Sequence, residues 1–279
     1  MPKIILLGDV HGKWEVANKF INYAIQEFDV AFAIQLGDFG FYKEICEIYK
    51  SFRFPIPLYV IDGNHDDHSL INDENINYWA KNNNIHFIKR GTVWNLFGCK
   101  MGFVGGSLNV DRRQYGTPGT STCNYVTLEE AKEYANVFNA FGKLDFIFAH
   151  SCPHSIGVKM VGDSSFTRSI YWNIKQPLGL DTGELTDCGE QALTELWNNL
   201  TEKPTHFVFG HFHNYHEKQV RETRFNCIGT VDYTSGLPVI PFIIDTKTKT
   251  LEAFPEKQIN QQELITFKRK KKKKHDRPN

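Results

Sequence analysis

The amino-acid sequence predicts an α/β fold, and three observations support this prediction. Short apolar runs rich in β-branched and aromatic residues recur along the chain and end in polar clusters, which is typical of buried strands. Segments with a helical apolar period lie between these runs, as expected for alternating strands and helices. Further apolar segments are typical of hairpin strands and indicate a second sheet.

Five of the predicted strands end in a cluster that contains Asp, Asn or His. They are KIILLGD (3–9), VAFAIQLGD (30–38), PLYVIDGNHD (57–66), LDFIFAH (144–150) and THFVFGHFH (205–213). Three other apolar segments predict hairpin strands, which we place in the second sheet. They are TVWNLFGCKMGFVGG (92–106), TRFNCIGTV (223–231) and LPVIPFIID (237–245).

Three helices are predicted between the strands. Residues 14–28 place apolar side chains at positions 14, 16, 17, 20, 21, 24, 25 and 28, which is the period of a helix with one buried face. Residues 127–141 begin with a capping box, in which Thr127 reaches forward and Glu130 reaches back. Asp187 and Glu190 have the same spacing at the start of residues 187–200, which predicts a second capping box there.

The rest of the chain indicates one domain with a charged tail. Residues 151–189 are rich in Gly and Ser and have little periodicity, so we interpret them as a long loop or an inserted cap. We find no internal repeat and no domain boundary before the basic end. The sequence therefore predicts one domain over residues 1–267 and a basic, disordered tail over residues 268–279.

The net charge of zero hides an uneven distribution of charge. Eight of the 32 basic residues and one of the 32 acidic residues lie from residue 268 onward, so the preceding part carries 24 basic and 31 acidic residues, a net charge of −7. The tail is consistent with a solubilising end, with a weak tether to nucleic acid or an anionic surface, and with a nuclear address. An acidic body argues against a nucleic-acid binding face on the domain itself.

Cysteine usage and the start of the sequence suggest a cytoplasmic protein. The six cysteines form no C-x-x-C pair, and reduced thiols are the simplest interpretation. The chain opens with MPKIILLGD, a short strand without the apolar core of a secretory signal. We find no apolar run long enough for a transmembrane segment, and the sequence does not indicate an oligomeric state.

The side chains at the ends of the five strands carry the chemistry. They are Asp9, His11, Asp38, Asn64, His65, His150, His211 and His213. Residues just beyond the carboxyl ends of strands in an α/β fold converge on one crevice, where ligands bind. Each residue alone is more often a turn, a cap or a structural histidine, but five strand ends of this kind in one chain are difficult to obtain by chance.

This mixture of side chains favours divalent metal ions. Carboxylate, imidazole and amide groups without a thiolate suit Mn, Fe, Zn or Ni. The set is too large for one ion and fits two, with Asp38 as the natural bridging carboxylate. Two ions about 3.5–4 Å apart can deprotonate a bridging water and hold the oxygens of a phosphoryl group during in-line attack.

The same residues carry a resemblance to a known family. Their blocks are Asp9-Val10-His11, Gly37-Asp38, Gly63-Asn64-His65-Asp66, His150 and Gly210-His211-Phe212-His213. In order and spacing they resemble the D-x-H, G-D, G-N-H-[DE], lone His and G-H-x-H blocks of the calcineurin-like metallophosphoesterase superfamily, over residues 7–213. The resemblance implies a four-layer fold of two packed mixed β-sheets flanked by α-helices.

The resemblance also implies a role for each residue. It places Asp9, His11 and His213 on a first metal ion and Asn64, His150 and His211 on a second, with Asp38 bridging. A metal-bridging hydroxide would attack phosphorus. His65 would be the general acid that protonates the leaving oxygen, and Asp66 would orient its ring.

The second block departs from one branch of the family. Ser/Thr phosphoprotein phosphatases have G-D-x-x-D-R there, and their Arg grips the substrate phosphate, whereas this chain has Phe41 and Tyr42 in place of Asp-Arg. Arg112 and Arg113, in the Gly-rich stretch GGSLNVDRRQYG, are candidate substrate contacts in its place, although a solvated surface pair is an equal interpretation.

The expected function is hydrolysis of a phosphodiester or phosphomonoester with two divalent ions, Mn favoured. A Ser/Thr phosphoprotein phosphatase-like enzyme and a non-catalytic scaffold of the same fold are the alternatives. The missing Arg argues against the first of these, and the complete ligand set argues against the second. The acidic body argues against long nucleic acids as substrates, although the tail would attract them at low salt.

Overall fold

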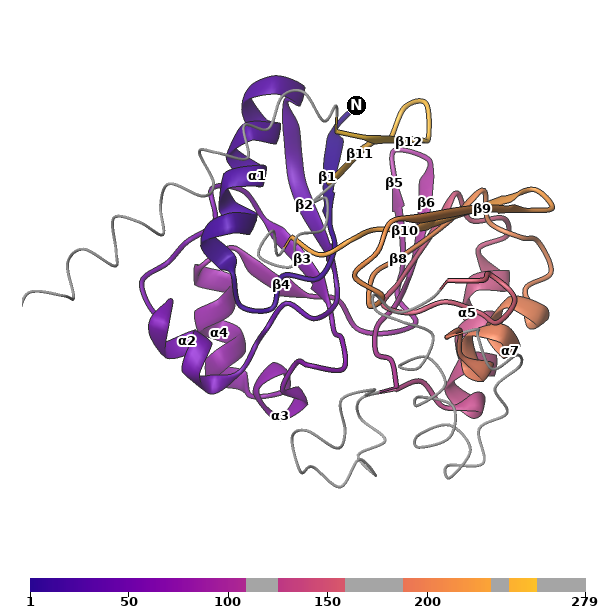
Figure 1. Ribbon diagram of the computed structural model, residues 1–279, viewed down its shortest axis with the longest axis horizontal. Helices are drawn as coiled ribbons and strands as arrows, with labels where there is room; N and C mark the ends of the chain where they lie inside the picture. Colours follow the sequence, from indigo (N-terminus) through magenta and orange to yellow (C-terminus); the bar gives the residue numbers. More distant parts are fainter. Residues whose placement is uncertain (109–124, 159–187, 232–240, 255–279) are drawn as a thin grey trace, which may run out of the picture.

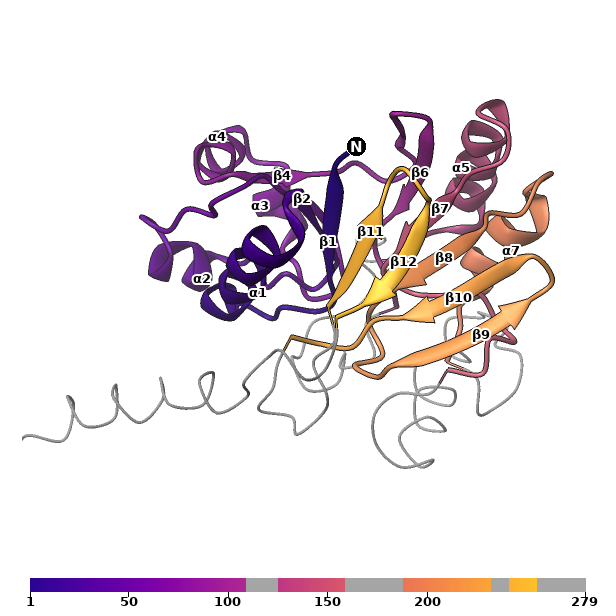
Figure 2. The ribbon, with the colours of Figure 1, turned by 90° about the horizontal axis from the view of Figure 1, so that it is seen from above.

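A computed structural model describes residues 1–108, 125–158, 188–231 and 241–254. Within these residues the strands form two sheets of six strands each, and helices cover the outer face of each sheet (Figures 1 and 2). Of the sequence expectations, the basic tail and most of the stretch from 151 to 189 lie outside the described residues.

The first sheet has the order β12-β11-β1-β2-β3-β4. Its strands are β1 (Lys3–Leu7), β2 (Val30–Leu36), β3 (Leu58–Ile61), β4 (Ile85–Phe87), β11 (Phe242–Asp245) and β12 (Thr250–Ala253). Strands β1 to β4 run parallel to one another, whereas β11 is antiparallel to β1 and β12 is antiparallel to β11.

The second sheet has the order β5-β6-β7-β8-β10-β9. Its strands are β5 (Val93–Leu96), β6 (Cys99–Val104), β7 (Phe146–Ala149), β8 (His206–Phe209), β9 (His216–Val220) and β10 (Thr223–Cys227). Strands β6, β7, β8 and β10 are parallel, and the hairpin partners β5 and β9 form the antiparallel edges.

Helices α1 (Trp14–Phe28), α2 (Lys43–Ile48), α3 (His68–Ile71) and α4 (Glu74–Asn82) lie on the side of the first sheet, and α5 (Leu128–Ala140) and α7 (Gln191–Asn199) on the side of the second (Figure 2). Three apolar layers hold these parts together: one between the first sheet and its helices, one between the second sheet and its helices, and one between the sheets. In the middle layer Leu36 and Ile61 of the first sheet share a core with Phe148 of the second. The structure thus confirms the predicted α/β class and the two packed mixed sheets.

The helix predicted over residues 14–28 has these bounds, and its buried face includes Trp14, Phe20 and Ile21. The capping box at the start of α5 is also present: the Thr127 hydroxyl accepts from the backbone N–H of Glu130, and the Glu130 carboxylate accepts from that of Thr127. These features follow from local sequence alone, which is why they were predictable.

Two expectations are wrong. The segment 237–245 contributes β11 to the first sheet and not to the second, because β11 pairs with β1 over residues 242–245. The second capping box does not form, because α7 begins at Gln191 with Glu190 as its N-cap residue. The Glu190 carboxylate accepts instead from the backbone N–H of Leu108, at 3.1 Å.

Candidate functional site

The carboxyl ends of strands from both sheets meet at one place. Asp9 and Asp38 follow β1 and β2 by two residues, His150 directly follows β7, and His211 and His213 follow β8. Their ligand-type atoms form two groups, each within 4.8 Å: Asp9, His11, Asp38 and His213 in the first, and Asp38, His150 and His211 in the second. Asp38 belongs to both groups.

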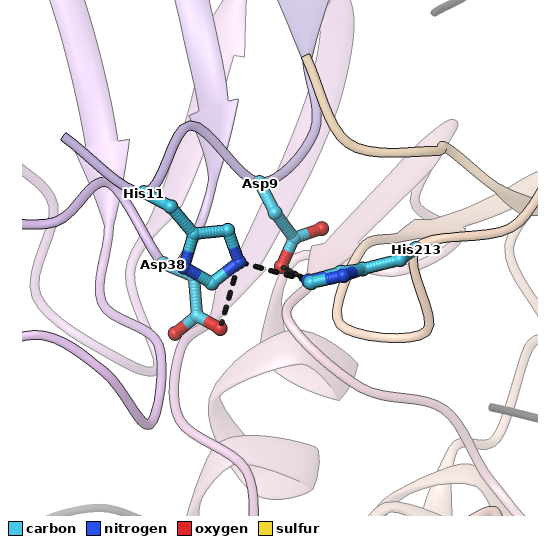
Figure 3. Close-up of side chains that lie close together, drawn as sticks. All are labelled: Asp9, His11, Asp38 and His213. Carbon is cyan, nitrogen blue, oxygen red and sulfur yellow. Dashed lines mark hydrogen bonds and ion pairs between the residues drawn. The ribbon is translucent and has the colours of Figure 1, made fainter. Parts of the chain in front are cut away.

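The first group brings Asp9, His11 and Asp38, which follow strands of the first sheet, together with His213, which follows a strand of the second (Figure 3). Nε2 of His11 lies 2.8 Å from Nε2 of His213 and 3.9 Å from Oδ2 of Asp38. Nε2 of His213 lies 3.8 Å from Oδ1 of Asp9. The side chains of His11 and His213 are 25% and 34% exposed, whereas both carboxylates are buried.

Backbone contacts fix the loops that carry this group. The N–H groups of Val10 and His11 both donate to the carbonyl oxygen of Asp38, at 3.0 and 2.8 Å. The buried amide of Gln35 donates to the carbonyls of Gly8 and Gly37, so one side chain ties the loop after β1 to the loop after β2. These contacts hold the two aspartates close together despite the repulsion between their charges.

The second group is buried. Nδ1 of His150 lies 2.7 Å from the carbonyl oxygen of Leu36, which can only accept, so this nitrogen carries the proton. Nε2 of the same ring then faces Oδ1 of Asp38 at 3.3 Å and Oδ1 of Asn64 at 3.2 Å. If the ring is neutral, Nε2 carries a lone pair, and three acceptor atoms then face one another with no hydrogen between them. Such an arrangement requires a cation or a proton among the three atoms.

The pKa values at the site reflect the same requirement. Burial opposes the charged form of His150, but the nearby Asp38 carboxylate outweighs it and raises the pKa of His150 to about 10. Burial would raise the pKa of Asp38, but the surrounding histidines, His150 first, hold it well below its ordinary value. The pKa of His211 is well below its ordinary value because the ring is buried and lies beside His150. A proton on His150 thus compensates the buried Asp38 charge in the metal-free protein.

Four of these side chains come from residues in the left-handed backbone region. The φ angles are 46° at His11, 53° at Asp38, 69° at His211 and 53° at His213. Residues other than glycine rarely adopt this region, at a cost of roughly 1–3 kcal/mol each, and such residues cluster at functional sites. The fold therefore supports a strained backbone at the point where the candidate ligands converge.

His65 and Asp66 lie beside the two groups. The backbone N–H of His65 donates to Oδ1 of Asp38 at 2.8 Å, and its ring centroid is 5.4 Å from that of His11. The Asp66 carboxylate accepts from four backbone N–H groups, those of residues 39, 40, 41 and 63, at 2.9–3.3 Å. Asp66 therefore organises the loop that follows Asp38, and its expected action on the His65 ring stays a prediction.

The loop after Asp38 is built from aromatic residues. Phe39 and Phe41 are fully buried, and the Trp14 ring stacks on Phe39 with centroids 4.7 Å apart. At the positions of the Asp-Arg pair of the Ser/Thr phosphatases, this loop carries the buried Phe41 and the half-buried Tyr42. The other candidate cations, Arg112 and Arg113, lie outside the residues that the structure describes.

Sequence reasoning missed two polar contacts next to the site. The fully buried Ser107, three residues after β6, places its Oγ 2.6 Å from Oδ1 of Asn64 and 3.2 Å from Nδ1 of His211. Asp62, directly after β3, pairs with Arg90 through Nε at 3.0 Å. The local signal for Ser107 is the Gly-Gly-Ser sequence after a strand, which does not indicate its partners.

The donor set fits a pair of divalent cations. Two carboxylates, an amide oxygen and imidazole nitrogens converge from both sheets. Nε2 of His150, Oδ1 of Asp38 and Oδ1 of Asn64 face one another and already require a positive charge. No thiolate belongs to either group, so a hard or borderline metal ion suits them better than a soft ion that prefers sulfur ligands.

Comparison with known proteins gives one family and a set of similar folds. The model of the calcineurin-like phosphoesterase family matches residues 2–233. The crystal structure of TT1561 from Thermus thermophilus is similar with a TM-score of 0.57 and 11% identity, over 91% of this chain and 99% of that one. At this identity the likeness concerns the fold alone. A search of curated proteins gives no match.

Two further structures are similar at lower TM-scores. A novel archaeal phosphodiesterase has a TM-score of 0.45 and 14% identity, over 90% of this chain and 98% of that one. A dimetal phosphatase from Danio rerio has a TM-score of 0.48 and 12% identity, over 82% of this chain and 88% of that one.

Within the described residues, none of the helices combines the length and apolar character that a bilayer crossing requires.

Proposed function

Because this chain belongs to the calcineurin-like phosphoesterase family, we propose that it hydrolyses phosphate esters with two divalent metal ions. The observation that carries this proposal is that two groups of ligand-type side chains share Asp38. A shared carboxylate between two ions is suited to a dinuclear site in which both ions contact one phosphoryl group.

The residues divide between two ions. Asp9, His11 and His213 would hold the first, and Asn64, His150 and His211 the second, with Asp38 common to both. When bound, the ions would supply an activated water and positive charge for the phosphoryl oxygens. The remaining tasks belong to the chain itself.

The exposed side of the first group is where a substrate would approach. His11 and His213 are partly exposed, whereas His150 and His211 are buried. His65 would donate a proton to the leaving oxygen, since its backbone contact to Asp38 keeps it beside the site. The backbone amides that donate to Asp66 keep the loop after Asp38 in the shape that presents the Asp38 carboxylate.

Small phosphate esters, diesters or monoesters, are the expected substrates. The loop after Asp38 carries Phe41 and Tyr42 and thus lacks the guanidinium with which Ser/Thr phosphoprotein phosphatases hold the phosphate. Mn²⁺ is the favoured ion for the carboxylate, amide and imidazole set.

The test is hydrolysis by protein that has been stripped with a chelator and reloaded with Mn²⁺. We expect release of p-nitrophenolate from p-nitrophenyl phosphate, from bis(p-nitrophenyl) phosphate, or from both, together with about two bound ions per chain. A panel of natural monoesters and diesters then identifies the preferred class. Two bound ions without turnover on any of these esters would contradict the proposal and favour a non-catalytic scaffold.

A further inference from the structure

The amide of Asn64 presents a problem that the carboxylate of Asp38 does not. An amide has an oxygen end and an NH₂ end of nearly the same shape, and only the oxygen can hold a cation. Oδ1 of Asn64 faces Nε2 of His150 at 3.2 Å, and the same Nε2 lies 3.3 Å from Oδ1 of Asp38, so the amide lies against the second group. A protonated Nε2 of His150 favours the oxygen end, but an imidazole nitrogen that holds an ion carries no proton. A contact that does not depend on that proton is therefore needed to keep the oxygen end in place.

Ser107 makes the contact that distinguishes the two ends. Its Oγ lies 2.6 Å from Oδ1 of Asn64, and an amide oxygen can only accept, so the hydroxyl donates. If the amide turned, its NH₂ end would donate to Oγ. Oγ would then face two donors whenever Nδ1 of His211 carries the proton, as it would if His211 held its ion through Nε2, and the buried hydroxyl would lose the acceptor of its own proton. The same Oγ lies 3.2 Å from Nδ1 of His211, so one hydroxyl contacts both the Asn64 amide and a histidine of the second group.

The backbone on each side of Ser107 is fixed. The N–H of Gly106 donates to the carbonyl oxygen of Asp62 at 2.7 Å, and the N–H of Leu108 donates to the buried Glu190 carboxylate at 3.1 Å. Asp62 is itself held by the Arg90 guanidinium. The Ser107 side chain is completely buried, so water does not compete for its hydroxyl.

From this geometry we infer that Ser107 is a positioning residue that orients the Asn64 amide oxygen, and with it the second metal subsite. The inference rests on the proposed dinuclear function and extends it to a residue outside the ligand set. Partners of this kind fix ligand orientation, and their removal typically costs about 10–100-fold in metal affinity.

The first experiment measures Mn²⁺ binding to chelator-stripped protein by calorimetry. The wild type should bind two ions, and Ser107→Ala should weaken the second by about 10–100-fold while leaving the first within about twofold. Electron paramagnetic resonance gives an independent readout, because loss of the second ion replaces an exchange-coupled Mn pair with a single-ion spectrum. Equal weakening of both ions, or of neither, overturns the inference.

A double-mutant cycle tests the mechanism. In Asn64→Asp either end of the side chain is an oxygen, so orientation no longer matters. Adding Ser107→Ala to that variant should change the affinity for the second ion by less than about twofold. The difference from the loss that Ser107→Ala causes in the wild-type background measures the coupling between the two positions. The same loss in both backgrounds would show that the hydroxyl does not act through Asn64.

Ser151→Ala is the matched control. Ser151 is fully buried and follows His150 directly, yet among the described residues its Oγ has no hydrogen-bond partner. It should bind both ions like the wild type, and loss of the second ion in this control would contradict a specific role for Ser107. If the wild type binds two ions and Ser107→Ala keeps both, only this inference fails. If the wild type binds none, the proposed function fails with it.

Discussion

The two ligand groups share one aspartate but differ in exposure and in charge. The first combines two buried carboxylates with partly exposed imidazoles, His11 and His213. Within the described residues, the second has Asp38 as its only carboxylate, its other members are buried imidazoles, and the neutral Asn64 amide lies beside it. The first group is therefore suited to exchange with solvent and contact with substrate, and the second to permanent retention of an ion.

The largest expected effect comes from the residue that belongs to both groups. Asp38→Asn removes the common carboxylate, and we expect loss of both ions and of at least about 10³-fold in kcat/KM, since each tenfold is about 1.4 kcal/mol of transition-state stabilisation. Metal analysis of the purified variant and steady-state kinetics measure this. Retention of one tightly bound ion would show that the groups are more independent than their shared ligand suggests.

His65 tests the exposed side alone. Replacement by Ala should reduce turnover of esters with poor leaving groups by about 10²-fold or more, because these need a proton on the leaving oxygen. Turnover of p-nitrophenyl esters should fall much less, since p-nitrophenolate leaves without protonation. Ion content should remain at the wild-type level. Equal losses on both substrate types would be incompatible with a general acid at this position.

The stability of the metal-free protein should depend on pH through His150 of the buried group. In the metal-free protein the pKa of His150 is raised to about 10, above its unfolded value near 6.5. Its proton therefore stabilises the metal-free fold fully below about pH 6.5, and this stabilisation disappears as the pH rises toward 10. We expect the Tm of metal-free protein to fall from about pH 6.5 to about pH 9, while the Tm of Mn²⁺-loaded protein falls less. A Tm independent of pH in the metal-free form would show that His150 is neutral there.

The smallest expected effect is a difference in the rate of ion loss. Because His11 and His213 are partly exposed and His150 and His211 are buried, a chelator should remove the first ion at least several-fold faster than the second. Stopped-flow release of Mn²⁺ to a fluorescent chelator should show two phases of equal amplitude. A single phase would indicate that the difference in burial has no effect on exchange.

Much of the fold and of the site could be predicted because the signals are local. Asp9 and Asp38 follow neighbouring parallel strands of the first sheet, and His150 follows a parallel strand of the second. Parallel strands bring such ends to one edge within each sheet. The period of the apolar residues predicts the helix over residues 14–28, and the capping box predicts the start of α5.

What remained hidden depends on contacts between distant parts of the chain. Ser107 meets Asn64 over 43 positions and His211 over 104, and nothing in the Gly-Gly-Ser sequence indicates either partner. Likewise Glu190 matched a capping pattern, but its carboxylate accepts from Leu108 instead. Tertiary hydrogen bonds of this kind overrode the local pattern.

The pairing of β11 with β1 has a consequence for how the protein is made. Strand β1 leaves the ribosome long before its partner at residues 242–245, so the first sheet cannot be completed until nearly all of the described chain exists. At ~5–20 residues per second this delay is roughly 10–50 s, during which one edge of β1 stays open. His211 and His213 also emerge late, long after Asp9 and Asp38. On the proposed function, capture of both ions would therefore wait until most of the chain has been made, and chaperones have a defined window in which to protect the nascent chain.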